Sequence, residues 1–243
     1  MLVDAAFAGG YHGFREGNLL GLLYSLFERM DAYFGLPSVA NKKTLVGNCR
    51  RQLLRDAVRQ IFKLELNELN KQSPWLDKTC NPETILLAPE LVQMWPNCRI
   101  IFARRRAIEN ILSRLKKFPE RNFQFHCRDW ARCMYAWRCV RDELEPWRYL
   151  EVDQRDLVVQ PEIVARAMAK LLKLDDKAIG RISDSFRNLR PQQTAPGTTD
   201  RVVPLSDTPW TPPQIAAFND ICGTEMEAYG YSLDGAYWKK AAA

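Results

Sequence analysis

The chain has 243 residues, of which 47% are hydrophobic and 26% charged, as expected for a globular protein with one substantial core. No apolar run reaches the roughly 18 to 20 residues that span a bilayer, and the N-terminus lacks a signal-peptide pattern, so we expect a cytoplasmic protein. The net charge of +6, with a pI of about 9.0, suits an acidic ligand such as a nucleotide and equally an ordinary basic surface.

The first 94 residues are predicted to be mainly helical, because their apolar residues recur at helical spacing. The exception is residues 2–7, which could form a strand ended by Gly9 and Gly10. The predicted helices cover residues 18–34, 42–69 and 82–94.

The second half of the chain alternates strands with helices. We expect strands at 99–103 and 147–152, helices at 107–117, 122–145, 161–174, 176–186 and 212–229, and a polar loop at 187–210. Strands separated by helices predict an α/β protein with a small parallel sheet covered on both faces. No linker divides the sequence, so residues 1–243 are expected to form one domain, with 233–243 as a tail.

The seven cysteines contain no Cys-x-x-Cys pair, which favours free thiols in a reducing compartment. His12 and His126 are the only histidines, and neither is spaced for metal binding with a cysteine pair. We therefore expect no metal.

An apolar strand followed at once by Arg104, Arg105 and Arg106 and then by a helix is typical of an anion site at the carboxyl end of a strand. Ser113 lies about 9 Å along that helix, given a rise of 1.5 Å per residue. A long arginine side chain can lie back over this distance. Arg105 and Ser113 could therefore contact one phosphate group.

Several segments, in order, resemble the sulfotransferases that use 3′-phosphoadenosine 5′-phosphosulfate (PAPS). Trp75–Thr79 is similar to a Lys-Thr-Pro element of the family, and Trp95–Ile101 is similar to its approach to a strand. Arg105 to Ser113 is similar to an Arg-x7-Ser element, and Asp153–Val158 with Pro161 is similar to Tyr-Glu-Asp-Leu-x-x-x-Pro. Trp210–Pro212 with Cys222–Tyr231 is similar to a closing helix. The resemblance covers roughly residues 70–232 and depends on order and spacing together.

This resemblance implies a P-loop-type three-layer α/β/α fold and transfer of a sulfuryl group from PAPS to a hydroxyl or amine. Arg105 and Ser113 would bind the 3′-phosphate of PAPS or of its product PAP, and Arg201 would close over it. Lys78 would stabilise charge on the bridging oxygen as PAP leaves. Glu16 is the candidate base, with His12 as a second candidate.

The sequence also departs from the family pattern. The Gly- and Ser/Thr-rich turn that binds the 5′-phosphosulfate is not present, so we expect it to lie N-terminal to Met1, in a chain that lacks its first strand. Cys80 and Ala107 replace prolines, and Gln154 replaces the tyrosine of the Tyr-Glu-Asp-Leu element.

Two alternatives remain open from the sequence. The first is a non-catalytic module of the same fold that binds PAP or another nucleotide. The second is a basic helical protein that binds nucleic acid through a cationic stripe, which comprises Arg104–Arg106, Arg114, Lys116, Lys117 and Arg121.

Overall fold

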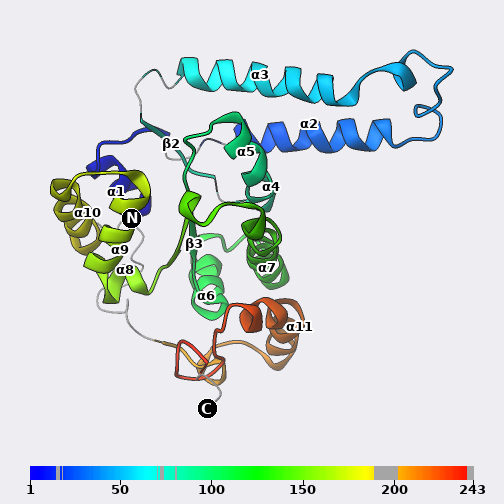
Figure 1. The fold of residues 1–243 in the computed structure, drawn as a ribbon. Coiled ribbons are helices and arrows are strands. Elements are labelled where there is room, and N and C mark those ends of the chain that lie inside the picture. Colours follow the sequence, from blue (N-terminus) through cyan, green and yellow to red (C-terminus); the bar gives the residue numbers. More distant parts are fainter. Residues whose placement is uncertain are drawn as a thin grey trace.

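The computed structural model describes residues 1–14, 17, 19–69, 71, 74–79, 81–188 and 202–239 (Figure 1). The helices are α1 (Leu2–Ala8), α2 (Leu19–Phe34), α3 (Arg51–Leu69), α4 (Pro82–Leu86), α5 (Ala88–Met94), α6 (Ala107–Lys117), α7 (Phe123–Val140), α8 (Asp156–Val159), α9 (Pro161–Leu172), α10 (Asp176–Asn188) and α11 (Pro212–Ala228). The strands are β1 (His12–Phe14), β2 (Trp75–Asp77), β3 (Ile100–Arg104) and β4 (Tyr149–Asp153).

The strands form two small parallel sheets. β1 pairs with β2 in the register His12 to Trp75, and β3 pairs with β4 in the register Ile100 to Tyr149. In a parallel pair the carboxyl ends lie at the same edge, so each sheet brings two strand-to-loop junctions together. The predicted helix-rich α/β fold with a small parallel sheet is confirmed.

Helices cover both faces of the β3/β4 sheet. On one face Phe102 stacks on Trp137 of α7 with ring centroids 4.7 Å apart, in a cluster that also includes residues of α6 and α11. On the other face Ile101 packs against a cluster built by α1, α9 and α10. Figure 1 shows these helices on opposite sides of β3. Burying alternate strand residues on both sides gives the three layers.

The sequence predicts α6 at its observed bounds and most other helices to within a few residues. Local capping explains two of the starts. The Asn122 side chain accepts a hydrogen bond from the Phe125 N–H at 2.8 Å at the start of α7. Thr211 and Gln214 form a capping box at the start of α11. Within the part of the chain described, no helix is long and apolar enough to cross a membrane.

Two predicted elements differ in the structure. Residues 2–7 form helix α1 and not a strand, because Ala5 and Ala6 favour a helix and their small side chains let it pack closely on α10. The helix expected at 42–69 begins only at Arg51. Before it, the Asn48 side chain bonds the carbonyl oxygens of Lys42 and Thr44, which stabilises a turn.

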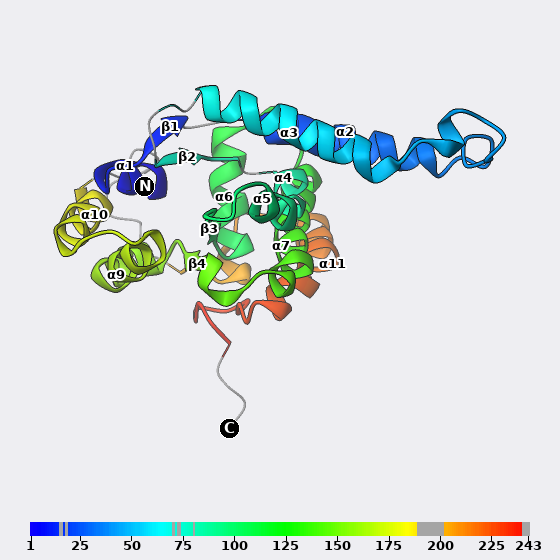
Figure 2. The same cartoon turned by 45° about the horizontal axis from the view of Figure 1, so that its top comes forward.

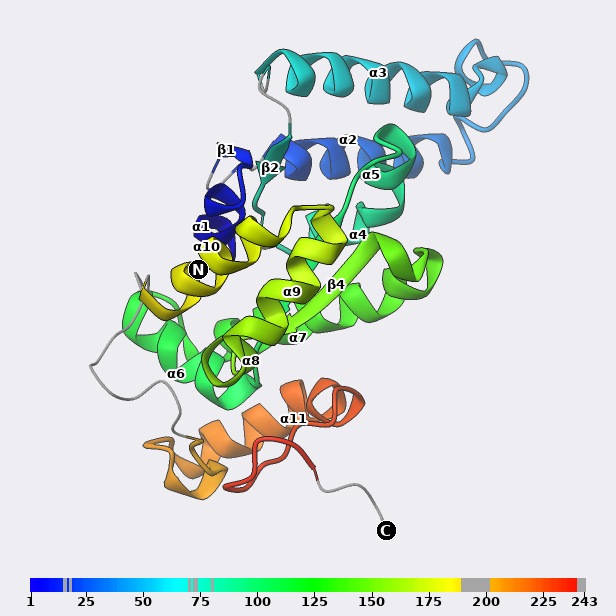
Figure 3. The same ribbon diagram turned by 60° about the vertical axis from the view of Figure 1, so that its left-hand side comes forward.

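The α2–α3 pair forms a hairpin along one side of the molecule (Figure 2). Its base packs on α5 through a third apolar cluster that contains Leu23, Phe62 and Met94. Arg55 contributes ion pairs of 3.0 Å to Asp31 and 2.8 Å to Glu90. The far end of the hairpin extends away from the two sheets (Figures 2 and 3).

Candidate functional site

The three consecutive arginines after β3 have three different environments. Arg104 pairs with Glu151 at 3.3 Å and lies over the rings of Tyr229 and Trp238. Arg106 is fully buried. Arg105, in the turn between β3 and α6, makes no ion pair with any residue that the structure describes. Among the three, Arg105 is therefore the arginine without a carboxylate partner among the described residues, and it is partly buried.

A hydrogen bond anchors the backbone of Arg105, and burial and nearby charges shift the pKa of its guanidinium. Its carbonyl oxygen accepts a hydrogen bond from Trp130 Nε1 at 2.9 Å, which anchors the turn to α7. Burial lowers the pKa of the Arg105 guanidinium, and the negative charges of Glu109 and Asp153 partly offset that effect. The group remains a cation at neutral pH, since arginine does not lose its proton in proteins.

Arg106 joins the start of α6 to the C-terminal segment. It donates to both carboxylate oxygens of Glu109, with Nε to Oε2 at 2.8 Å. Its remaining contacts are backbone oxygens at 2.7–3.3 Å, those of Val203, Ser232, Asp234 and Ala236. A buried guanidinium with this many acceptors is fully compensated, so it holds the C-terminal segment against the strand ends.

Asp153, at the end of β4, is the second anchor of that segment. Its carboxylate accepts hydrogen bonds from the hydroxyls of Tyr231 at 2.6 Å and Tyr237 at 2.8 Å, and from the Arg155 N–H at 2.8 Å. Burial, and then the charge of Asp153, raise the pKa of both tyrosines, so both remain protonated donors. The Tyr237 oxygen in turn accepts the Arg106 N–H at 3.0 Å. We call Arg106, Glu109, Asp153, Tyr231 and Tyr237 the buried polar network.

Lys78 lies at the carboxyl edge of the other sheet, directly after β2, and is partly buried. The Gly17 N–H donates to the Lys78 carbonyl oxygen at 3.2 Å, so the chain leaving β1 returns beside Lys78. A methyl group added at Gly17 would overlap the Asp77 carboxylate, so any larger residue there would have to displace that side chain. Glu16, the predicted base, lies outside the described residues.

Asp77 is a group that the sequence reasoning did not single out. Its Oδ1 atom is buried with no hydrogen-bond partner among the residues described. Burial raises the pKa of this carboxyl, while hydrogen bonds from the Thr79 hydroxyl and the Lys78 backbone act in the opposite direction. Its position between Trp75-Leu76 and Lys78 is the only sequence signal that could have identified it.

The predicted site residues thus fall into two groups. Arg105 and Ser113 belong to the β3–α6 unit, and Ser113 is partly buried on α6. Lys78 belongs to the β1/β2 edge. Arg201 lies outside the described residues. Sequence reasoning missed the buried polar network, although Tyr231 ends the Cys222–Tyr231 segment that supports the resemblance.

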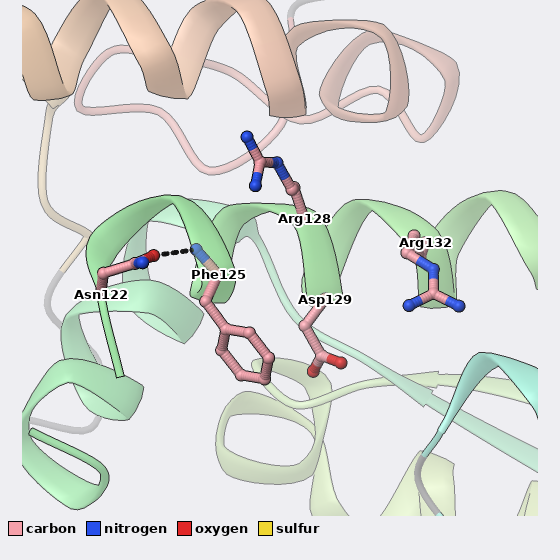
Figure 4. A pocket seen from close by; sticks show the side chains of 5 residues that line it. All are labelled: Asn122, Phe125, Arg128, Asp129 and Arg132. Atoms are coloured by element: carbon pink, nitrogen blue, oxygen red, sulfur yellow. Dashed lines mark hydrogen bonds between the residues drawn. The ribbon is translucent and has the colours of Figure 1, made fainter. Parts of the chain in front are cut away.

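Shallow pockets lie along α7, near its contact with α6. One, of about 220 Å³, is lined by Asn122, Phe125, Arg128, Asp129 and Arg132 (Figure 4). A neighbouring pocket of about 270 Å³ is lined by Arg114, Phe118, Glu120, Arg121, Phe125 and His126. Ion pairs occupy part of this surface, with Arg114 bound to Asp129 at 2.7 Å and Arg132 to Glu83 at 2.7 Å.

Comparisons with known proteins agree with the sulfotransferase resemblance. A family model described as "Sulfotransferase family" matches residues 29–178, a range that contains Lys78, Arg105 and Ser113. Among solved structures, a sulfotransferase domain from the curacin biosynthetic pathway matches with 17% identity and a TM-score of 0.38, over 73% of this chain and 62% of that one. This chain therefore spans less than two thirds of that structure. No curated protein matches the sequence significantly.

Proposed function

Because the chain belongs to the sulfotransferase family, we propose that it acts on PAPS and transfers its sulfuryl group to a hydroxyl or amine of an acceptor. The observation that supports this most strongly is the position of Arg105. It lies at the carboxyl edge of a parallel sheet, between two arginines that are already paired. A terminal phosphate supplies the oxygen acceptors that such a guanidinium binds in a planar fork.

In the proposed complex, the 3′-phosphate of the nucleotide binds Arg105 and the hydroxyl of Ser113, with Arg201 as a further cation over it. The buried polar network keeps the β3–α6 turn in place, because it fixes the N–H of Arg106, the residue next to Arg105. Arg106 and Asp153 are therefore positioning residues in this proposal, and they do not touch the nucleotide.

The proposed reaction is an in-line transfer. The acceptor oxygen or nitrogen attacks sulfur, the bond from sulfur to the bridging oxygen of PAPS breaks, and PAP leaves with the electron pair. Lys78 stabilises the charge that forms on the bridging oxygen. The acceptor proton passes to Glu16 as the base. The hydrogen bond from Gly17 to Lys78 supports this pairing, because it holds the residue that follows Glu16 beside Lys78.

Titration with PAP by calorimetry tests the binding step. We expect micromolar binding that falls at least about tenfold in Arg105→Ala, since that variant removes a charge-assisted contact to phosphate. Ser113→Ala should cause a smaller loss. Arg166→Ala is the matched control, because Arg166 is an exposed arginine on α9. If Arg105→Ala binds PAP as tightly as the parent chain, the proposed site is wrong.

A specific feature favours a second candidate, a non-catalytic nucleotide-binding module. The sequence contains no Gly- and Ser/Thr-rich turn of the kind that would bind the transferable sulfate. A radiolabelled-sulfate transfer assay separates the two. PAP binding together with transfer that is lost in Lys78→Met supports the enzyme, whereas PAP binding without transfer by this chain or by one extended upstream supports the module.

The structure weakens the case for nucleic-acid binding. Arg106 of the predicted cationic stripe is fully buried, and Arg104 and Arg114 are held in ion pairs. The stripe therefore offers fewer available cations than its sequence suggests. If single-stranded nucleic acid binds with a steep salt dependence and PAP does not bind, this alternative replaces our proposal.

A further inference from the structure

Helix α3 has two faces of opposite character. The inner face packs on α2 and α5 through Phe62 and Leu66. The outer face exposes an apolar row: Leu54 (42% exposed), Ala57, Ile61 (64%) and Leu64 (69%). Figures 1 and 3 both show α3 at the outer edge of the molecule, with α2 between it and the rest of the chain. An exposed apolar row that is contiguous along a helix is a candidate interaction surface.

The spacing places these side chains on one line. The intervals from Leu54 to Ala57, Ile61 and Leu64 are three, four and three residues, which is the pattern of helices that pack side by side. The line extends by four residues in each direction, to Arg50 just before the helix and to Glu68 near its end. The complete row is Arg50, Leu54, Ala57, Ile61, Leu64 and Glu68, and we call it the outer row.

The outer row is complementary to itself when it is reversed. When a second copy of the row runs antiparallel to the first, with the two-fold axis at residue 59, each residue lies opposite a suitable partner. The opposed pairs are Arg50 with Glu68, Leu54 with Leu64, and Ala57 with Ile61. A two-fold symmetric interface requires this property, because each residue must suit its partner in both directions. A partner whose surface carries one sign of charge, such as an acidic protein or an anionic surface, would match only one end of the outer row. The row has a cation, Arg50, at one end and an anion, Glu68, at the other.

We propose that α3 pairs antiparallel with α3 of a second copy of this chain through the outer row, independently of the function proposed above. The small Ala57 side chain next to Ile61 lets the helices approach closely near the symmetry axis. Among the residues that the structure describes, Glu68 forms an ion pair with Lys71, and both side chains are about 70% exposed. Such a surface pair contributes little, so Glu68 can exchange it for Arg50 of the second copy. The apolar row is about 15 Å long, so we expect a weak dimer with a micromolar dissociation constant.

Analytical ultracentrifugation of the full chain, from about 1 to 200 µM, tests the apolar part of the outer row. We expect a concentration-dependent dimer in the parent chain. The double variant Ile61→Glu, Leu64→Glu should weaken it at least about a hundredfold, because it buries four carboxylates at the interface. The control is Leu45→Glu, since Leu45 is 85% exposed in the α2–α3 connection and lies off the outer row. All substituted positions are exposed, and circular dichroism verifies folding.

Charge reversal tests the antiparallel pairing. Arg50→Glu and Glu68→Arg should each weaken the dimer about tenfold, because each places like charges at both ends. Mixing these two variants should restore association, since the mixed dimer has an opposite-charge pair at each end. A monomer at every concentration, a dimer unaffected by the Ile61 and Leu64 changes, or a mixture that associates no better than either variant alone would overturn the proposal.

Discussion

The carboxyl edges of the two sheets contrast in how their buried polar groups are paired. At the β3/β4 edge Asp153 accepts three hydrogen bonds, and the Arg106 guanidinium has six oxygen acceptors within reach. At the β1/β2 edge Asp77 keeps a buried oxygen without a partner among the described residues. The first arrangement stabilises the fold, whereas the second reduces its stability.

This contrast suggests that the two sheet edges have different roles. At the β3/β4 edge the Asp153 carboxylate and the Arg106 guanidinium are both paired, although Arg104 Nε is buried without a hydrogen-bond partner among the described residues. The paired groups are suited to holding Arg105 in place before a ligand binds. At the β1/β2 edge one carboxylate oxygen of Asp77, beside the proposed catalytic lysine, has no hydrogen-bond partner among the residues that the structure describes, which is typical of sites where function takes precedence over stability. Substitutions at the two edges should therefore change the free energy of unfolding in opposite directions.

The largest effect should come from Arg106→Ala. This change leaves the buried Glu109 carboxylate without its counter-ion and removes donors from four backbone oxygens. We expect a loss of about 3–5 kcal/mol in the free energy of unfolding, measured by urea denaturation. The control Arg166→Ala should stay within about 0.5 kcal/mol. A loss below about 1 kcal/mol would show that the buried polar network is not the anchor that we describe.

A smaller loss should follow from Tyr231→Phe. The variant removes one hydroxyl and the 2.6 Å hydrogen bond to the Asp153 carboxylate, while the ring remains. Hydrogen bonds to charged groups contribute about 1.5–3 kcal/mol, and we expect a loss in that range. The matched control is Tyr135→Phe, because Tyr135 is 56% exposed on α7. Equal unfolding midpoints for the two variants would contradict the prediction.

Sequence patterns predicted one of these edges better than the other. β3 and α6 are long enough to show an apolar run and a helical period, so their junction at Arg104–Arg106 could be located from the sequence. β1 and β2 have three residues each, which is too short for a period, and neither was predicted. They pair with each other across some sixty residues of intervening chain, a contact that no local pattern in the sequence indicates.

Sequence reasoning also could not separate the three arginines by environment. Arg106 differs from its neighbours because a segment some 126 residues later supplies its acceptors. Tyr237, which belongs to that segment, falls in the part of the sequence that we assigned to a tail, yet it is buried and bonded to Asp153. Resemblance in order and spacing predicted Arg105 and Ser113 as site residues, while the contact that anchors Arg105 to α7 depends on tertiary packing.

The smallest effect, and the one of opposite sign, should come from Asp77→Asn. Burial raises the pKa of Asp77 in the folded state above its ordinary value, so between the unfolded and folded pKa values the folded chain binds more protons. The free energy of unfolding of the parent chain therefore falls as pH rises through that window, and above the window the loss stays constant.

Asparagine does not titrate, so the variant should be more stable at pH 7 by roughly 0.5 kcal/mol, since water screens a partly exposed carboxylate. Urea denaturation at pH 7 and at about pH 3.5 should show this advantage shrinking in acid, below the ordinary carboxyl pKa. A variant that is less stable at pH 7, or an advantage that is equal at both pH values, would mean that Asp77 is satisfied and that the two edges do not differ in this respect.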